Sequence, residues 1–187
     1  ISGYIKHPAK HPGSFRFIKQ RSRPCAGTEI LSSAHFPKEN QGNLMAANVI
    51  GFQGLFQWEY HDDDSGFLGK EVHPIISSKD FRFRPADIEM GSDGAIYFLD
   101  WYNPIIGHMQ HHLRDPSRDT SHGRVYRVTA KGRALSTRVD MTALTVSQLL
   151  DQLKSPENRV RYRARLELSG RDTTEVVASA NTFLKGL

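Results

Sequence analysis

The chain has 187 residues, enough for one domain or for one and a half. Its formal net charge is +5, and its 38% of hydrophobic residues, before glycine is counted, is ordinary for a globular protein. No apolar run approaches the roughly 20 residues that cross a bilayer, so we expect no membrane span in this segment, and the single cysteine excludes an internal disulfide.

Residues 1–28 are rich in proline, glycine and basic side chains, and we expect them to form a long loop. Basic runs of this kind occur in nucleic-acid-binding segments. Prolines interrupt this one and no nucleic-acid-binding module surrounds it, so we favour a solvated connector and expect no nucleic-acid partner. Because the chain starts at Ile1 without a basic-then-apolar leader, we expect it to be an interior piece of a longer protein.

Short apolar or alternating runs then predict four strands, at Glu29–Phe36, Asn43–Ile50, Phe52–Tyr60 and Phe67–Ile76. The third alternates with the period of two that is typical of a strand. The segment Asp62-Asp63-Asp64-Ser65-Gly66, with three consecutive acids, separates the last two strands. We interpret it as a solvated turn, because the ligand at position 12 of a helix–loop–helix calcium site is missing. His35 has no supporting context and is expected to be an ordinary polar residue.

The stretch from residue 81 to residue 127 organises the rest of the chain. Its two apolar runs, Ala86–Met90 and Ala95–Leu99, flank Gly91-Ser92-Asp93-Gly94. An Asp-Gly pair between such runs predicts a hairpin, since glycine accepts the positive φ of the turn. A third run at Val125–Val128 follows a long polar loop, and loops of that length usually have a function.

A weak internal repeat supports a bladed architecture. Residues 41–48 resemble residues 93–100, which lie about 50 residues later, and such a period with several short strands per unit indicates propeller blades.

The sequence pattern changes after Val128, from strand-like runs to a polar segment and then to helical spacing. Residues 129–139 are polar and basic, which is typical of a linker. The spacing i, i+3, i+4, i+7 predicts the first helix, which is apolar at Val146, Leu149, Leu150 and Leu153. Thr145 and Gln148 form a capping box at its start.

Two more helices are expected. The second, Pro156–Leu168, begins with Ser155 as N-cap and ends at Gly170. The third, capped by Asp172 and Glu175, extends to about Leu184. Short paired helices with apolar stripes cannot bury themselves alone, so they indicate the first units of a helical solenoid.

The segment Asp100-Trp101-Tyr102-Asn103-Pro104-Ile105-Ile106-Gly107-His108-Met109-Gln110-His111-His112-Leu113-Arg114-Asp115-Pro116, continued by His122-Gly123-Arg124-Val125-Tyr126-Arg127, resembles the planctomycete-type membrane-bound dehydrogenases. The stretches 25–30, 35–37 and 48–54 also resemble that family, so the resemblance covers nearly the whole chain. It implies a mainly β fold. Residues 1–130 would be the C-terminal blades of a β-propeller similar to quinoprotein glucose dehydrogenases, 131–143 a linker, and 144–187 the start of HEAT-like repeats.

The same resemblance implies a function. The intact protein would be a periplasmic or otherwise extracytoplasmic dehydrogenase of a sugar or polyol, passing electrons to a c-type haem domain outside this chain. Its other partners would be the remaining blades and repeats of the same polypeptide, and the piece alone would be inactive. Two alternatives stay open: a non-catalytic scaffold that binds carbohydrate or protein, and a metal-dependent hydrolytic propeller.

The candidate residues for the active face of the propeller have ionisable or aromatic side chains and lie in or near the long loop. We assign no catalytic residue among them. They are Arg82, Arg84, Asp87, Asp100, Trp101, Tyr102, His108, His111, His112, Arg114, Asp115, Arg118, Asp119, His122 and Arg124. In the quinoprotein glucose dehydrogenases, which Gly91–Tyr97 and Gly123–Val128 resemble more distantly, arginines just before the corresponding strand hold the carboxylates of pyrroloquinoline quinone. Arg82 and Arg84 are the candidates, although Pro85-Ala86 departs from the family's spacing before Asp87.

Each candidate group also has a structural interpretation. The histidines 108, 111 and 112 either ligate a metal or form a polar loop. The Arg-Asp pairs at 114–115 and 118–119 either bind an anionic or polyhydroxylated substrate or pair with each other. Trp101 and Tyr102 either stack on a sugar ring or pack at the rim. Asp87 is either a buried acid near the propeller axis or a hydrogen-bonding residue at the start of a strand.

Overall fold

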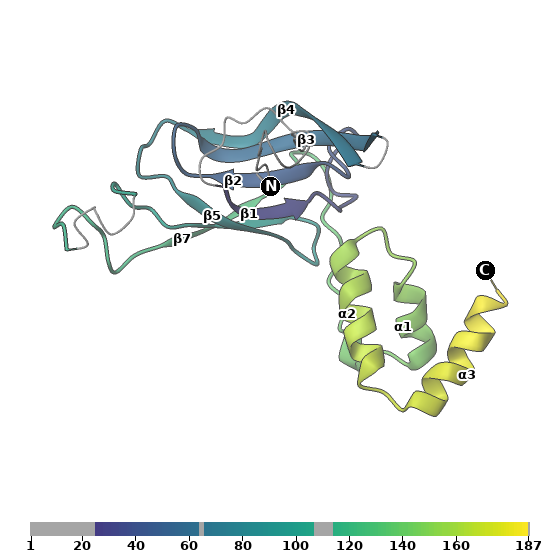
Figure 1. Cartoon of the computed structure of the whole chain (residues 1–187). Coiled ribbons are helices and arrows are strands. Elements are labelled where there is room, and N and C mark those ends of the chain that lie inside the picture. Colours follow the sequence, from purple (N-terminus) through teal and green to yellow (C-terminus); the bar gives the residue numbers. More distant parts are fainter. Residues whose placement is uncertain (1–24, 64–65, 107–113, 187) are drawn as a thin grey trace, which may run out of the picture. The chain divides into compact units, whose positions relative to one another are not determined.

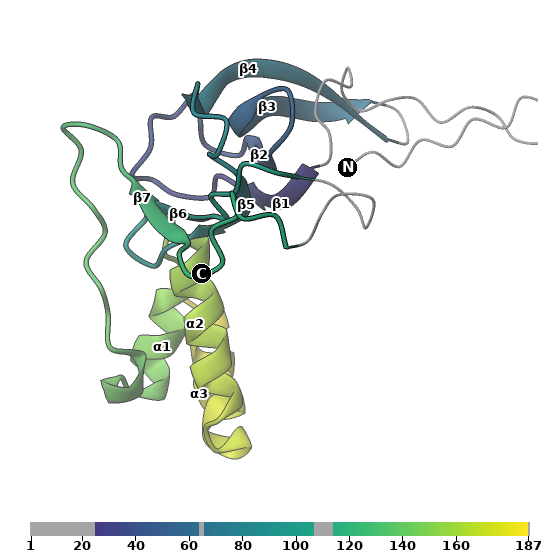
Figure 2. The same ribbon diagram turned by 90° about the vertical axis from the view of Figure 1, so that its left-hand side faces the viewer.

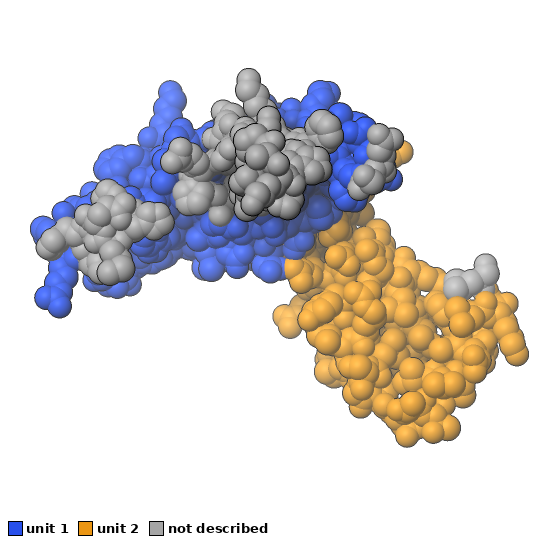
Figure 3. Space-filling view, viewed as in Figure 1, with its two compact units in different colours: residues 1–31, 42–89, 97–127 blue, residues 32–41, 90–96, 128–187 orange. Residues whose placement is uncertain are grey.

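A computed structural model describes residues 25–63, 66–106 and 114–186. Over these residues the fold is mainly β, as predicted, with two antiparallel sheets followed by three α-helices (Figure 1). Contacts group the chain into two units, coloured in Figure 3. Unit 1 comprises residues 1–31, 42–89 and 97–127, and unit 2 comprises residues 32–41, 90–96 and 128–187.

The first sheet is an antiparallel meander in chain order. Its strands are β1 (Cys25–Ile30), β2 (Leu44–Asn48), β3 (Gln53–Asp63) and β4 (Gly66–Ser78). Every residue of β2 is buried, because apolar side chains cover both faces of the strand. One face holds a cluster of Leu44, Ala46, Phe56 and Trp58, in which Phe56 and Trp58 are almost completely buried.

The first strand differs from the prediction. β1 ends at Ile30, opposite Leu44, whereas the strand was expected at 29–36, and the loop expected over 1–28 is wrong from Cys25 onward. The apolar residues Leu31 and Phe36, which suggested a longer strand, are buried in the connection to β2 instead. Burial in a packed loop gives the same composition as a strand, so the sequence pattern could not separate the two.

The hairpin of β3 and β4 is longer than expected and contains a bulge. The pairing continues to Asp63 opposite Gly66, so Asp62 belongs to a strand rather than to the predicted turn at 62–66. The register shifts between Leu55 and Gln57, where β4 contains Pro74. Proline cannot donate to a ladder, and it is tolerated here because β4 is the edge strand of its sheet.

The second sheet consists of β5 (Pro85–Met90), β6 (Ile96–Asp100) and β7 (Arg124–Val128), in that order. The predicted Asp-Gly turn joins the first two strands. Gly94 has φ +85°, and its N–H donates to the Gly91 carbonyl at 3.0 Å. The hairpin prediction is confirmed, and so is its reason, since an L side chain rarely adopts this φ.

The two sheets adjoin at their first strands within unit 1. A Cβ added to Gly27 of β1 would lie 2.6 Å from Asp87 Oδ1 and 2.7 Å from Asp87 Cα of β5. Only glycine permits this approach of the two backbones. Figure 2 shows β1 and β5 side by side.

The hairpin ends of the two sheets also share their geometry. The Leu31 N–H donates to the Asn43 carbonyl at 2.9 Å, and the Gly91 N–H donates to the Ala95 carbonyl at 2.8 Å. Gly42 and Gly94 both have φ +85°. The weak sequence repeat therefore coincides with two matching strand-to-strand turns.

Unit 2 contains η1 (Met141–Ala143), α1 (Val146–Gln152), α2 (Asn158–Ser169) and α3 (Thr173–Leu184). Its helical core is built from Met141, Leu149, Val160 and Ala164. No helix among the described residues has the length and apolar character needed to cross a membrane.

The helix ends confirm most of the predicted caps. Both halves of the Thr145–Gln148 capping box are formed, Asp172 accepts from the Glu175 N–H at 3.0 Å, and Gly170 is the C-cap of α2. Ser155 is not the N-cap of α2. That position belongs to Glu157, and Ser155 Oγ accepts from the Glu157 N–H at 3.2 Å, so Pro156 lies outside the helix.

The N-terminus of α2 is tied to distant segments of unit 2 through the buried Glu157. Its Oε1 accepts from the Ala34 N–H at 3.0 Å and from Ser136 Oγ at 3.1 Å. His35 completes the junction: Nδ1 lies 2.8 Å from the Ala134 carbonyl, and Nε2 accepts from the Ala130 N–H at 2.8 Å. A carbonyl oxygen only accepts, so the proton of the neutral ring is on Nδ1.

Candidate functional site

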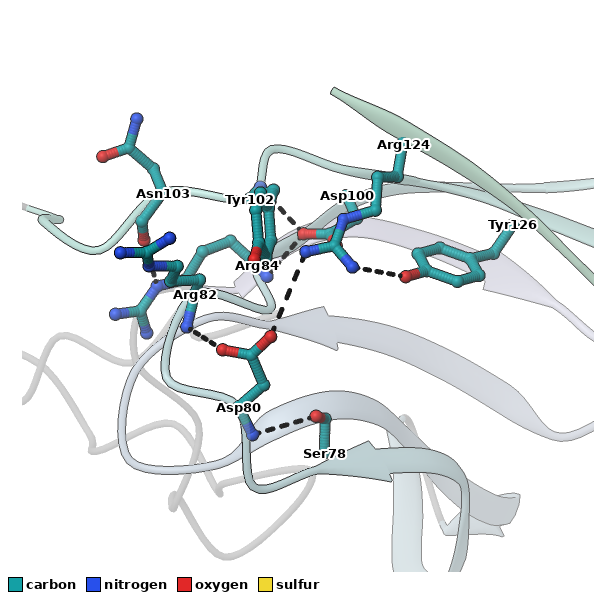
Figure 4. A network of polar contacts seen from close by, with 9 residues as sticks. All are labelled: Ser78, Asp80, Arg82, Arg84, Asp100, Tyr102, Asn103, Arg124 and Tyr126. Atoms are coloured by element: carbon teal, nitrogen blue, oxygen red, sulfur yellow. Dashed lines mark hydrogen bonds and ion pairs between the residues drawn. The ribbon is translucent and has the colours of Figure 1, made fainter. Parts of the chain in front are cut away.

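One edge of the second sheet brings together five of the predicted site residues: Arg82, Arg84, Asp100, Tyr102 and Arg124 (Figure 4). The arrangement follows from the topology. The start of β5, the end of β6 and the start of β7 lie at the same edge because neighbouring strands are antiparallel. Residues far apart in sequence therefore meet where the long loop leaves the sheet.

Asp100 is the buried centre of this cluster and is only 1% exposed. Its Oδ1 accepts from the backbone N–H groups of Arg84, at 2.7 Å, and Tyr102, at 2.8 Å. The second bond holds Tyr102 at φ 47°, a left-handed conformation that costs a non-glycine residue about 1 kcal/mol or more. Asp100 thus fixes the point at which the chain turns away from β6.

Arg84 is buried and acts as a clamp on the backbone. Its side chain donates to the carbonyls of Val49, Asn103 (3.0 Å from Nε) and Pro104 (3.4 Å from Nη2). Burial lowers the pKa of Arg84, and the neighbouring charges of Asp100 and Asp80 oppose that shift. The guanidinium is thus occupied by main-chain oxygens.

The hydrogen bonds of Arg84 to backbone carbonyls affect the predicted binding of pyrroloquinoline quinone. Two arginines were expected to hold the carboxylates of pyrroloquinoline quinone, and Arg84 has its donors committed elsewhere. Of these two arginines, only Arg82 is exposed. The described residues do not fit that cofactor as a two-arginine clamp, and we derive no step through it.

Arg124 is stacked on Tyr102, with Cζ 3.2 Å from the ring centroid. Its Nη1 donates to the Tyr126 hydroxyl at 3.0 Å, and its Nε lies 3.4 Å from Asp100 Oδ2. Asp80 is 4.0 Å from Nη2 of the same guanidinium. On the other side of the Tyr102 ring lies Arg82, with Cζ 5.9 Å from the centroid (Figure 4). One tyrosine ring is thus flanked by two guanidinium groups.

The acids of the long loop organise local turns. Asp115 Oδ1 accepts from the N–H and the hydroxyl of Ser117, and Asp119 Oδ1 does the same for Ser121. Arg118 reaches back to the site, where it donates to Asn103 Oδ1 at 3.3 Å and to the Ile105 carbonyl at 3.0 Å. This arginine therefore connects the loop to the residues that follow Asp100.

Asp119 should titrate far below an ordinary carboxyl. The N–H of Ser121 is the largest cause, helped by His122 and the Ser121 hydroxyl, and together they lower the pKa of Asp119 from 3.8 to about 2. A depressed folded-state pKa stabilises the fold above the unfolded value, and this contribution is lost as pH falls from about 4 towards 2. An NMR titration of the side-chain carboxyls checks the value, and Ser121→Ala should raise it. Titration of Asp119 near 3.8 would contradict the turn.

The remaining candidates lie apart from this cluster or outside the described residues. Asp87 is exposed on β5 rather than buried, and it helps to line a groove of about 180 Å³ on the sheet with Glu89, Tyr97, Phe98, Leu99 and Val125. Trp101 and Arg114 are exposed. His122 bonds to Asp119, with Nδ1 3.0 Å from Oδ2. His108, His111 and His112 fall outside the described residues, so their metal hypothesis stays a prediction.

Four members of the network were not predicted: Ser78, Asp80, Asn103 and Tyr126. Asn103 lies inside the Asp-Trp-Tyr-Asn-Pro segment, which was the available signal. Asp80 and Tyr126 have no such context, because they join the site only through the folded sheet. Within the described ranges, no group of three histidine, cysteine or acidic side chains is arranged to hold a metal ion.

Comparison with known proteins identifies a family. The family model described as Domain of unknown function (DUF7133) matches residues 14–132, the segment that contains both sheets and the site. No curated protein and no solved structure matches the chain.

Proposed function

The chain belongs to the DUF7133 family, and from that premise we propose that its sheets are neighbouring blades of a β-propeller that binds a sugar or polyol at the edge around Tyr102. Two features support the blades. Each sheet is a meander in chain order, and the first strands, β1 and β5, adjoin at Gly27 as the inner strands of adjacent blades do. The matching turns at Gly42 and Gly94 support the same architecture.

The observation on which the binding site rests is the flanked ring of Tyr102. The ring is only partly buried, its backbone is held in a costly conformation by Asp100, and guanidinium groups lie on both sides. Strained residues that the surroundings hold in place are concentrated at functional sites. Two exposed residues add aromatic surface: Trp101, which precedes Tyr102 in the sequence, and Phe81, whose ring centroid lies 5.7 Å from Arg82 Cζ. Aromatic faces suit the apolar face of a sugar, and guanidinium groups suit its oxygens.

We further propose that the intact protein oxidises the bound sugar or polyol outside the cytoplasm and passes the electrons to a c-type haem domain beyond this chain. In this proposal the described residues bind and orient the substrate. Asp100, Arg84 and Arg124 keep the strand ends and the long loop in place. The catalytic base would come from another blade of the same polypeptide.

The test uses the full-length protein, a panel of sugars and polyols, and an artificial electron acceptor, with and without added quinone. Tyr102→Asn removes the ring, and asparagine tolerates the left-handed backbone. We expect this variant to lower kcat/KM by about 5-fold, because a stacked ring contributes on the order of 1 kcal/mol. Tyr162→Asn, an exposed tyrosine on α2, is the matched control and should leave kcat/KM unchanged.

A non-catalytic scaffold is the second candidate, and the clamp made by Arg84 favours it. Arg84 and Asp100 spend most of their polar atoms on the backbone, as expected of residues that shape a binding surface. Binding of a carbohydrate without acceptor reduction, by every substrate tested and with or without quinone, would exclude the dehydrogenase and favour the scaffold.

A further inference from the structure

We propose that the site around Tyr102 selects a sugar acid, meaning a carbohydrate with one carboxylate, over a neutral sugar. The inference rests on the proposed function for the carbohydrate, and it adds the charge of the ligand and the residue that reads it. Arg82 would hold the carboxylate, and the pair Asp100–Arg124 would recognise a hydroxyl group.

The charges of the cluster leave one guanidinium unbalanced. Among the described residues drawn in Figure 4, the three arginines Arg82, Arg84 and Arg124 are accompanied by two carboxylates, those of Asp80 and Asp100. Asp100 and Asp80 lie 3.4 Å and 4.0 Å from nitrogens of Arg124, and both favour the charged form of Arg84. Among the residues that the structure describes, none places a carboxylate within ion-pair distance of Arg82. Within this set of five charged residues there is therefore an excess of one positive charge, located at the exposed Arg82.

Arg82 lies beside two aromatic rings on a fixed stretch of backbone, a position that suits the binding of an anionic sugar. Its Cζ lies 5.7 Å from the ring centroid of Phe81, which is 57% exposed, and 5.9 Å from that of Tyr102. The backbone beneath it is fixed, since the Arg82 N–H donates to Asp80 Oδ1 at 2.9 Å and the Asp80 N–H donates to Ser78 Oγ at 3.0 Å. A planar guanidinium binds a carboxylate through two parallel hydrogen bonds, while the neighbouring rings accept the apolar face of a sugar.

A hydroxyl is indicated by two buried atoms that lack hydrogen-bond partners in the described chain, Asp100 Oδ2 and Arg124 Nη2. The first can only accept and the second can only donate. A hydroxyl group does both, so one hydroxyl satisfies the pair. The Arg124 side chain is 35% exposed and the Asp100 side chain is 0% exposed, so a ligand hydroxyl reaches the pair only when the Arg124 side chain moves. A simple carboxylate could not supply this donor.

The single excess charge favours a carboxylate over a phosphate. A carboxylate has one negative charge and neutralises the site. A phosphate monoester has about −1.5 to −2 at pH 7 and would leave uncompensated charge beside Asp80 and Asp100. We therefore expect glucuronate to bind more tightly than glucose 6-phosphate, and both comparisons belong in the same experiment.

The experiment is isothermal titration of the full-length protein with glucuronate, glucose, glucose 6-phosphate and acetate at constant ionic strength. We expect glucuronate to bind at least 10-fold more tightly than glucose. Arg82→Ala should abolish that preference while leaving the affinity for glucose in place, and Arg82→Lys should keep part of it. Arg165→Ala, an exposed arginine on α2, removes the same charge elsewhere and should change nothing.

Other results overturn the inference. Equal affinity for glucuronate and glucose, an unchanged preference in Arg82→Ala, or no binding at all would exclude the carboxylate site. Tighter binding of glucose 6-phosphate would contradict the charge argument, and acetate binding as tightly as glucuronate would exclude the hydroxyl contact. Turnover of neutral sugars without any preference would refute the sugar acid and leave the dehydrogenase standing. Glucuronate binding without turnover would do the reverse.

Discussion

Replacing Asp100 by alanine is expected to lower the free energy of unfolding by about 3–5 kcal/mol. The substitution removes the carboxylate that lies beside the Arg124 guanidinium, and it leaves the backbone N–H groups of Arg84 and Tyr102 without an acceptor. The carboxylate also holds Tyr102 at φ 47°, so its loss should release the turn into the long loop. Chemical denaturation, followed by tryptophan fluorescence and far-UV circular dichroism, measures the change.

Two variants separate charge from shape in this prediction. Asp100→Asn keeps an oxygen that can accept from Arg84 and Tyr102, but removes the charge and places an amide NH2 beside Arg124, so we expect a smaller loss of about 1–3 kcal/mol. Asp62→Ala removes an exposed acid from β3 and should stay within about 0.5 kcal/mol of the wild type. If Asp100→Ala unfolds at the same denaturant concentration as Asp62→Ala, the buried network does not stabilise the sheet edge.

The features that the sequence predicted correctly are local ones. The turn at Gly94 needs only a residue that accepts a positive φ, and the capping box of Thr145 and Gln148 closes within one helical turn. The apolar spacing at Val146 and Leu149 likewise reports a face of a single helix. Such signals depend on a few consecutive residues, so the rest of the fold cannot change them.

The site could be predicted only in part, because its geometry comes from strand pairing. The sequence pointed to Asp100, Tyr102 and Arg124, since they stand at the ends of the predicted strands around the long loop. It could not show that the Arg84 guanidinium would donate to the carbonyls of Val49, Asn103 and Pro104, because these contacts form only when the two sheets have folded.

The same reason explains the misplaced N-cap of α2 and the unrecognised His35. Serine is a common N-cap residue, which is why Ser155 was predicted to cap α2. Glu157 is the N-cap instead, because Ala34 and Ser136 donate hydrogen bonds to its side chain. His35 had no distinguishing neighbours in sequence, and its two ring nitrogens find their partners at Ala130 and Ala134. Long-range backbone partners leave no local pattern.

Glu157→Ala is expected to lower the free energy of unfolding of unit 2 by about 2–4 kcal/mol. The substitution removes the buried acceptor of the partly buried Ala34 N–H and Ser136 hydroxyl, and a buried donor left unsatisfied costs about 1–3 kcal/mol. Hydrogen exchange should show the effect directly: the Ala34 amide and the first turn of α2 should lose protection before the core of α1 does.

The matched variants test whether the acceptor itself is responsible. Glu157→Gln keeps a side-chain oxygen at the same distance from the backbone, so most of the stability and the protection of Ala34 should return, with a residual loss of about 1 kcal/mol. Glu175→Ala removes an exposed acid in the first turn of α3 and should cost at most about 0.5 kcal/mol through the helix dipole. Equal losses for Glu157→Ala and Glu157→Gln would mean that the charge, rather than the accepted hydrogen bonds, holds the start of α2. Unchanged protection at Ala34 in both variants would mean that the loop around His35 is held by Arg133 and the imidazole alone.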